Sequence, residues 1–374
     1  MIMRKLLKTV LITVIALMLI FHLSFITSAV SETSYYGEDI VFDAVPDEFV
    51  KLFDEMGITS LEFDSIFNVR FEDVLRVIKE LVTGSVESPM RSLARLVALI
   101  IILAVFECFV PEVHKFKNIM RLSANLLCVV SIIKPLTTAI TSAVASVTVS
   151  ENFILVLIPV LTAVISVSGN PVLATSFQTI VFAVAQIISA IVTEFIVPLL
   201  GVILAIDVTG SLIPEFRLSS ISSSVKKTVT SVISFAATLF VSFLGLKGGL
   251  ANAADSFTGR GVKLVLSSTV PVVGGALSEA YSGVLGSILL AKSTIGVFGI
   301  AVIALVNLPS CIQLLFWIFA LRIASGIADL FDQDGISGLM RSIASTLVLL
   351  NVIVVLVAVL FIISTVLILI LKAG

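Results

Sequence analysis

The chain has 374 residues, of which 58% are hydrophobic and 13% are charged. In an ordinary soluble domain roughly a quarter of the residues are charged, and the surface of a soluble fold cannot cover such an excess of apolar side chains. The mean hydropathy of +1.20 therefore predicts that the lipid bilayer is the main solvent. The 23 basic and 25 acidic residues nearly balance, so composition offers no basic surface for binding nucleic acid.

Few residues of the chain are suited to catalysis or to holding a metal. The three cysteines lie in apolar runs without CxxC spacing, which argues against a disulfide framework and a cysteine-based metal site: Cys108, Cys128 and Cys311. No phosphate-binding GxxxxGK[ST], HExxH or nucleophile-elbow pattern occurs. We therefore expect a non-enzymatic protein without a cofactor, a metal site or catalytic residues.

Residues 1–29 have the layout of a signal peptide. Three basic residues, Arg4, Lys5 and Lys8, precede an apolar stretch at 9–26, and small residues at cleavage spacing follow at 27–31. The stretch is long for a signal peptide, so an uncleaved membrane anchor is the alternative to cleavage. Both alternatives place the following residues outside the cytosol.

Residues 30–91 form a predicted acidic extracytoplasmic segment. Fourteen acidic and four basic residues lie between positions 32 and 90, and apolar residues such as Phe49, Phe53 and Met56 recur at helical spacing. We expect short amphipathic helices, which are either a solvated cap or a docking surface for an extracytoplasmic partner. The segment is short for an independent domain, so we expect it to lean on the membrane part or on a partner.

Residues 92–374 are predicted to be a polytopic transmembrane domain, because apolar runs long enough to cross a bilayer recur along it. The whole chain is thus predicted to be an all-α membrane protein with seven or eight transmembrane helices. The basic loop at 112–121 is expected in the cytosol and the loop at 147–152, without a basic residue, outside it. The third and sixth runs are candidates for re-entrant or tilted segments. The runs are 94–111, 122–145, 153–168, 177–206, 228–246, 264–290, 294–321 and 344–371.

Ionisable residues within these runs are candidate polar sites, because charge at membrane depth is costly and often functional. Lys134 and Glu194 lie deepest and either pair across helices or line a polar cavity. Glu279 is a third possible intramembrane polar site. Glu107 and Asp207 fall near predicted span ends, where interfacial carboxylates are expected.

Small residues recur every fourth position in one stretch, which predicts a flat helix face that another helix can approach closely. The face serves either packing within the chain or, alternatively, a subunit contact or pore lining. Its residues are Gly274, Ser278, Ser282 and Gly286, with Gly275 and Gly283 beside them.

Four sequence stretches resemble one known family. They are GLK at 245–247, ANAAD at 251–255, PVVGGALSEAY at 271–281 and LAKSTIGVFG at 290–299. Together with the order of a signal, an acidic segment and a polytopic body, they make the chain similar to the stage III sporulation protein AE family. That family has no catalytic motif to carry over.

The resemblance implies a role in endospore formation, in the mother-cell membrane that surrounds the forespore. There the protein would be a platform or pore subunit of a channel or secretion-like complex that supports late forespore gene expression. The implied partners are other membrane proteins of the same operon, including a separate ATPase, and a forespore-side partner. A homo-oligomer is a further possibility.

A stand-alone secondary transporter or permease is the alternative function. Broken segments near 169–171 and 271–275 would suit one, but the two halves of the chain show no convincing internal repeat.

Overall fold

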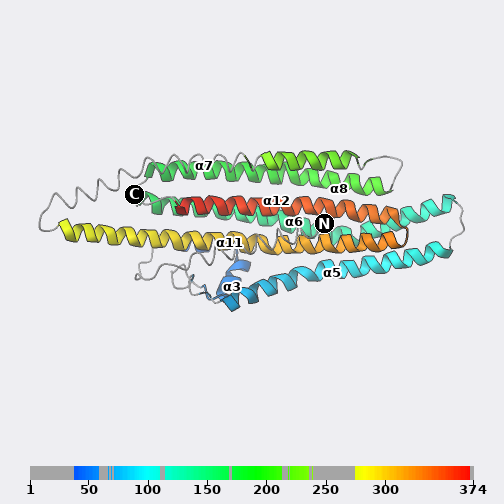
Figure 1. Cartoon of the computed structure of the whole chain (residues 1–374), viewed down its shortest axis with the longest axis horizontal. Helices are drawn as coiled ribbons and strands as arrows, with labels where there is room; N and C mark the ends of the chain where they lie inside the picture. The colour runs from blue at the N-terminus through cyan, green and yellow to red at the C-terminus, as the bar shows by residue number, and fades with distance from the viewer. Residues whose placement is uncertain are drawn as a thin grey trace.

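A computed structural model describes residues 38–58, 71–109, 114–167, 171–212, 220–235 and 274–370, together with positions 66, 69, 218 and 238. All regular structure in these residues is helical, as the composition predicts. Figure 1 shows an elongated bundle in which the long helices run nearly side by side.

Two short helices precede the long helices of the bundle. The elements are α2 (Glu38–Asp43), α3 (Asp47–Glu55), α5 (Phe71–Phe109), α6 (His114–Val167), α7 (Pro171–Ala190), the π-helix η1 (Ile191–Ile196), α8 (Val197–Leu212), α11 (Gly274–Leu330) and α12 (Asp334–Ile370). Residues 220–235 are also helical.

Five helical stretches in the described residues are long and apolar enough to cross a membrane. They are Glu72–Glu107, Ile119–Ser166, Ala174–Ser211, Ser293–Leu330 and Asp334–Val366. The predicted run at 228–246 is described only at 228–235 and 238, and the run at 264–290 only from Gly274 onward, so the count of seven or eight stays a prediction.

The structure corrects the prediction of a loop at residues 147–152. This stretch is part of α6, a single helix of 54 residues that includes both the second and the third predicted runs. At 1.5 Å per residue its length is about 80 Å, against about 30 Å for the hydrocarbon core. The polar residues that suggested a loop are accommodated inside the bundle, because Ser150 and Glu151 have partners on neighbouring helices.

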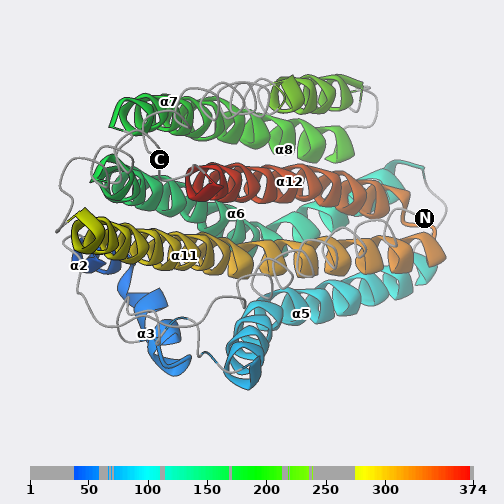
Figure 2. The same ribbon diagram turned by 60° about the vertical axis from the view of Figure 1, so that its left-hand side comes forward.

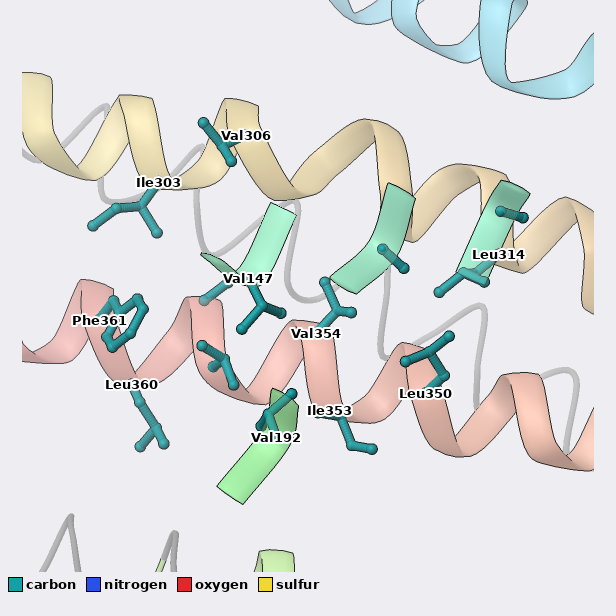
Figure 3. Packing of buried hydrophobic residues seen from close by; sticks show 14 of the residues in the cluster. Val147, Val192, Ile303, Val306, Leu314, Leu350, Ile353, Val354, Leu360 and Phe361 are labelled. Carbon is teal, nitrogen blue, oxygen red and sulfur yellow. The ribbon is translucent and has the colours of Figure 1, made fainter. Parts of the chain in front are cut away.

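The apolar core is centred on the antiparallel pair α11 and α12. Figure 3 shows Ile303 of α11 pointing toward α12, Val306 on the same helix, and Val147 of α6 between α11 and α12. Val192 of η1 lies near Ile353 of α12. All five side chains are almost completely buried, so α12 packs between α11 with α6 on one side and η1 on the other.

The turn between α11 and α12 is held by an ion pair. Asp332 adopts a φ of 55° in the turn, and Asp329 and Arg341 approach to 2.5 Å across it. Arg341 also donates a hydrogen bond to Ser325, at 3.0 Å. These contacts fix the register in which the apolar faces of α11 and α12 meet.

The acidic N-terminal helices pack against the bundle. In α3 the side chains of Phe49 and Phe53 are buried, which confirms the predicted amphipathic pattern there. Phe53 packs on Phe298 of α11 with ring centroids 5.0 Å apart, and Phe42 packs on the same ring at 5.8 Å. Residues 1–29, the predicted signal peptide, lie outside the described residues, and the predicted domain boundary at 91–92 falls within α5.

The π-helix η1 lies directly before a proline. Pro198 has no N–H to donate to the carbonyl of Glu194, and its ring crowds that carbonyl in a regular α-helix. The wider π turn bonds differently: the N–H of Val197 reaches the carbonyl of Val192, five residues back. Single π turns of this kind often occur at functional sites.

Candidate functional site

The most strongly buried charge pair in the described structure joins Asp207 of α8 to Lys226 of the segment 220–235. The carboxylate Oδ2 and the ammonium Nζ are 2.9 Å apart, and the Asp207 side chain is 2% exposed. Burial of this kind is costly unless the charges are paired and their remaining hydrogen-bonding capacity is met. Asp207 lies near the end of the candidate span Ala174–Ser211, as the sequence predicts, and its carboxylate is buried between helices there.

Helix α12 completes this site with hydroxyl and carbonyl oxygens. Lys226 donates to Oγ of Ser345 at 2.7 Å and to the backbone carbonyl of Ser342 at 3.2 Å. Thr346 donates to Oδ2 of Asp207 at 3.4 Å. An ammonium group has three protons, and each finds an acceptor here, so the hydrogen-bonding capacity of Lys226 is fully used within the site.

These satisfied hydrogen bonds limit what the site can do. Lys226 has no proton left over for a ligand, and the contacts tie three helical segments together at one point. Among the described residues no group of three histidines, cysteines or carboxylates could hold a metal ion. The arrangement suits a buried latch between helices better than a binding or catalytic centre.

A second polar group lies between α6, α7 and α11. The Nδ2 of Asn307 donates to Oγ of Ser150 at 2.7 Å, and Ser189 of α7 donates to a carboxylate oxygen of Glu151. The Oδ1 of Asn307 is buried and has no hydrogen-bond partner in the structure. Hydrogen bonds between helices stabilise membrane bundles modestly, so this group fixes how the three helices meet.

Of the three predicted intramembrane polar residues, the structure describes the side chains of Lys134 and Glu194. Lys134 lies exposed on α6 and Glu194 lies exposed on η1. Within the described residues neither one forms an ion pair, so the predicted pairing of Lys134 or Glu194 across helices finds no support. Glu279 belongs to α11, but its side chain lies outside what the structure describes. Glu107 approaches Arg121 of α6 to 3.6 Å with both groups partly exposed, in keeping with an interfacial carboxylate.

The predicted small-residue face begins where α11 begins, at Gly274. Its side-chain surroundings lie outside the described structure, so its contacts stay a prediction. The residues concerned are Gly274, Gly275, Ser278, Ser282, Gly283 and Gly286.

Two glycines further along α11 make the close approach that was expected of that face. A Cβ on Gly296 would lie 2.7 Å from Cγ of Leu369, and one on Gly299 would lie 3.0 Å from Cδ1 of Leu157. Real Cβ atoms do not come so close without displacing a neighbour, so the side chains of Leu369 of α12 and Leu157 of α6 lie directly against the α11 backbone. Both glycines lie within the LAKSTIGVFG stretch.

The latch residues and this packing face escaped the sequence analysis for different reasons. The sequence does not single out Lys226, because nothing local links it to a carboxylate 19 residues earlier. A spacing signal did exist on α6, where small residues recur at intervals of three or four residues and are buried: Ala139, Ala143, Ser146 and Ser150.

The bundle and its buried polar contacts define a class: a polytopic helical membrane protein without a recognisable catalytic centre in its described part. The family model for stage III sporulation protein AE matches residues 59–372. The chain belongs to that family.

Stage III sporulation protein AE of Bacillus subtilis (strain 168) is 23% identical to the chain over 189 residues. That match covers 50% of this chain and 47% of the relative, so it spans about half the length of each. No solved structure matches the chain.

Proposed function

We propose that this protein is a non-enzymatic membrane component, a platform or pore subunit, of a channel or secretion-like complex between mother cell and forespore. Membership of the stage III sporulation protein AE family over residues 59–372 carries the proposal. The five candidate spans agree with a subunit embedded in a membrane. Its place would be the mother-cell membrane around the forespore, where it would support endospore formation and late forespore gene expression.

The proposed partners are other membrane proteins of the same sporulation operon, a separate ATPase and a forespore-side protein. The exposed acidic residues of α3, Asp54 and Glu55, offer a surface to an extracytoplasmic partner while the apolar side of α3 is occupied by α11. An energy source elsewhere in the complex agrees with a chain that contains no nucleotide-binding motif.

Affinity purification from sporulating cells in a mild detergent tests the proposal. We expect a large assembly that contains other mother-cell sporulation membrane proteins, identified by mass spectrometry and sized by gel filtration. An unrelated tagged polytopic protein from the same cells is the control. Recovery as a lone monomer or dimer in several detergents would contradict the proposal and would favour a stand-alone transporter.

A further inference from the structure

A small pocket lies at the end of the bundle where α5 ends and α6 and α12 begin (Figure 1). Its volume of about 30 Å³ is room for one or two groups of the size of a water molecule. The pocket is separate from the site of Asp207 and Lys226, neither of which lines it. Its polar lining residues are Glu107, Arg121, Asn125, Gln333 and Asp334.

The charged and polar groups of this pocket have hydrogen-bonding capacity to spare. Arg121 approaches Glu107 to 3.6 Å, which is longer than a hydrogen bond between these groups. Neither side chain makes a hydrogen bond to another described residue. Gln333 is only 7% exposed, and its Oε1 has no donor, although its Nε2 donates to the carbonyl of Ile100 at 3.4 Å. Buried acceptors normally have a donor, so a ligand with N–H groups would complete the hydrogen bonding of Gln333.

Helix α12 adds the positive end of its dipole to the pocket. Residues 334–336 line the pocket and form the start of this 37-residue helix. The N–H of Ser337 bonds back to the carbonyl of Gln333, so the N–H groups of 334–336 precede the helical ladder and favour an anion. Together with Arg121 they suit a phosphate, whereas the carboxylate of Glu107 and the carbonyl of Gln333 suit an ammonium group. The lining therefore fits a ligand that carries both charges.

Exposed apolar side chains surround the pocket. More than half of the large hydrophobic side chains that are exposed in the described residues lie between Ile101 and Ile133 or in the turn between α11 and α12. Apolar surface of this extent beside a polar pocket marks an interaction site, and it reproduces the order of headgroup and acyl chains in a phospholipid. Those within three residues of a lining residue include Ile102, Phe106, Ile119, Leu122, Leu330 and Phe331.

We propose that this pocket binds the headgroup of phosphatidylethanolamine. The phosphate pairs with Arg121 and the first N–H groups of α12, the primary ammonium enters the pocket toward Glu107 and Gln333, and the acyl chains follow the exposed apolar side chains of α5 and α6. A primary ammonium is about the size of a water molecule, whereas the three methyl groups of choline exceed the volume of about 30 Å³. The site needs only this chain and a membrane, so it does not depend on the proposed complex.

Lipid retention by the purified full chain tests the proposal. The protein in a mild detergent would be incubated with equal amounts of phosphatidylethanolamine and phosphatidylcholine that carry identical acyl chains. After washing, the bound lipid would be quantified by mass spectrometry. We expect phosphatidylethanolamine to be retained at least about 10-fold more, because only the primary ammonium can donate hydrogen bonds to Glu107 and Gln333.

Two variants separate the parts of the headgroup. Arg121→Gln should lower the retention of phosphatidylethanolamine about 10-fold, because glutamine offers the phosphate no charge. Glu107→Gln should remove most of the preference for phosphatidylethanolamine over phosphatidylcholine. Arg76→Gln is the matched control: this arginine is 61% exposed and paired with Asp73 on α5, outside the pocket, so retention should not change. Gel filtration checks that each variant is folded.

Equal retention of the two lipids by the wild-type protein would overturn the proposal, and this comparison needs no variant to fold. Equal retention of phosphatidylethanolamine by Arg121→Gln and Arg76→Gln would overturn it as well. Excess inorganic phosphate should not displace the lipid, and displacement by phosphate alone would show a site for free anions instead. Folded wild-type protein that retains no phospholipid would also contradict the proposal and would leave the apolar surface to a protein partner.

Discussion

Replacing Gly299 by alanine places a methyl group where α6 touches the α11 backbone. The new Cβ would lie 3.0 Å from Cδ1 and 3.3 Å from Cγ of Leu157, and it would clash with Cδ2. Leu157 is completely buried, so it has no solvent into which to rotate. Overpacking of this kind costs about 1–3 kcal/mol. Alanine recovers about 1 kcal/mol through its better helix propensity, which leaves a net destabilisation of up to about 2 kcal/mol.

Gly338 on α12 is the matched control, because a Cβ there meets nothing within 4 Å. Gly338→Ala should keep the whole propensity gain, so the two variants should differ by about 1–3 kcal/mol in the free energy of unfolding. Trp317, the one tryptophan of the chain and fully buried, allows unfolding in a denaturing detergent titration to be followed by fluorescence.

Removing the clash should restore stability. Adding Leu157→Ala to Gly299→Ala should cost less than the two single effects summed, because neighbouring substitutions couple. The reasoning is refuted if Gly299→Ala is as stable as Gly338→Ala, or if Leu157→Ala gives no coupling.

Two further predictions follow from the buried contacts. Asp207→Asn leaves Lys226 buried without its counter-ion and should lower the free energy of unfolding by about 3–5 kcal/mol, whereas adding Lys226→Met should recover most of the loss; additive losses in the same titration would contradict a coupled pair. Phe53→Ala removes a buried ring from Phe298 and should cost about 3–5 kcal/mol of local stability, which limited proteolysis of α3 would detect. Ile40→Ala, at a position 59% exposed, should leave the cleavage rate nearly unchanged, and equal rates for the two variants would count against docking of α3.

The all-helical class and most of the long apolar helices were predictable, because a membrane chain must satisfy its backbone within each segment. That the second and third predicted runs belong to one helix, α6, was not predictable. Ser150 and Glu151 look like loop residues until Asn307 and Ser189 are placed beside them. The local sequence shows that a residue is polar, but it does not show whether a distant helix provides a hydrogen-bond partner for that residue.

The same limit applies to the candidate site. Asp207 was identified as an ionisable residue near a span end, but its partners come from a helix 19 residues later and from α12, more than 130 residues later. The tight glycines were also missed, because Gly296 and Gly299 are three residues apart and do not form the four-residue pattern on which the prediction relied. The sequence identifies which residues are polar or small, whereas the three-dimensional fold is needed to show which of them are in contact.

Prolines of α5, α6, α8 and α11 lie around one level, whereas Pro159 of α6 lies 24 residues from Pro135, about 36 Å along the helix. Helix α5 contains Pro89 and α11 contains Pro309. Ser85 of α5 donates a hydrogen bond to the carbonyl of Pro309, and Ser310 of α11 donates one to the carbonyl of Ser142 of α6, so these parts of the three helices lie at one level. Ser189 of α7 meets Glu151, so nine residues on in the antiparallel helix Pro198 lies level with the region of Ser142. Proline weakens the helical hydrogen-bond ladder and lets a helix bend.

Helix α12 has 37 residues and no internal proline. It therefore has no proline at which to bend, whereas the neighbouring helices contain prolines near one level. Bending at that level would splay or gather one end of the bundle while the other end, held by Asp207, Lys226 and the α11–α12 turn, stays in register.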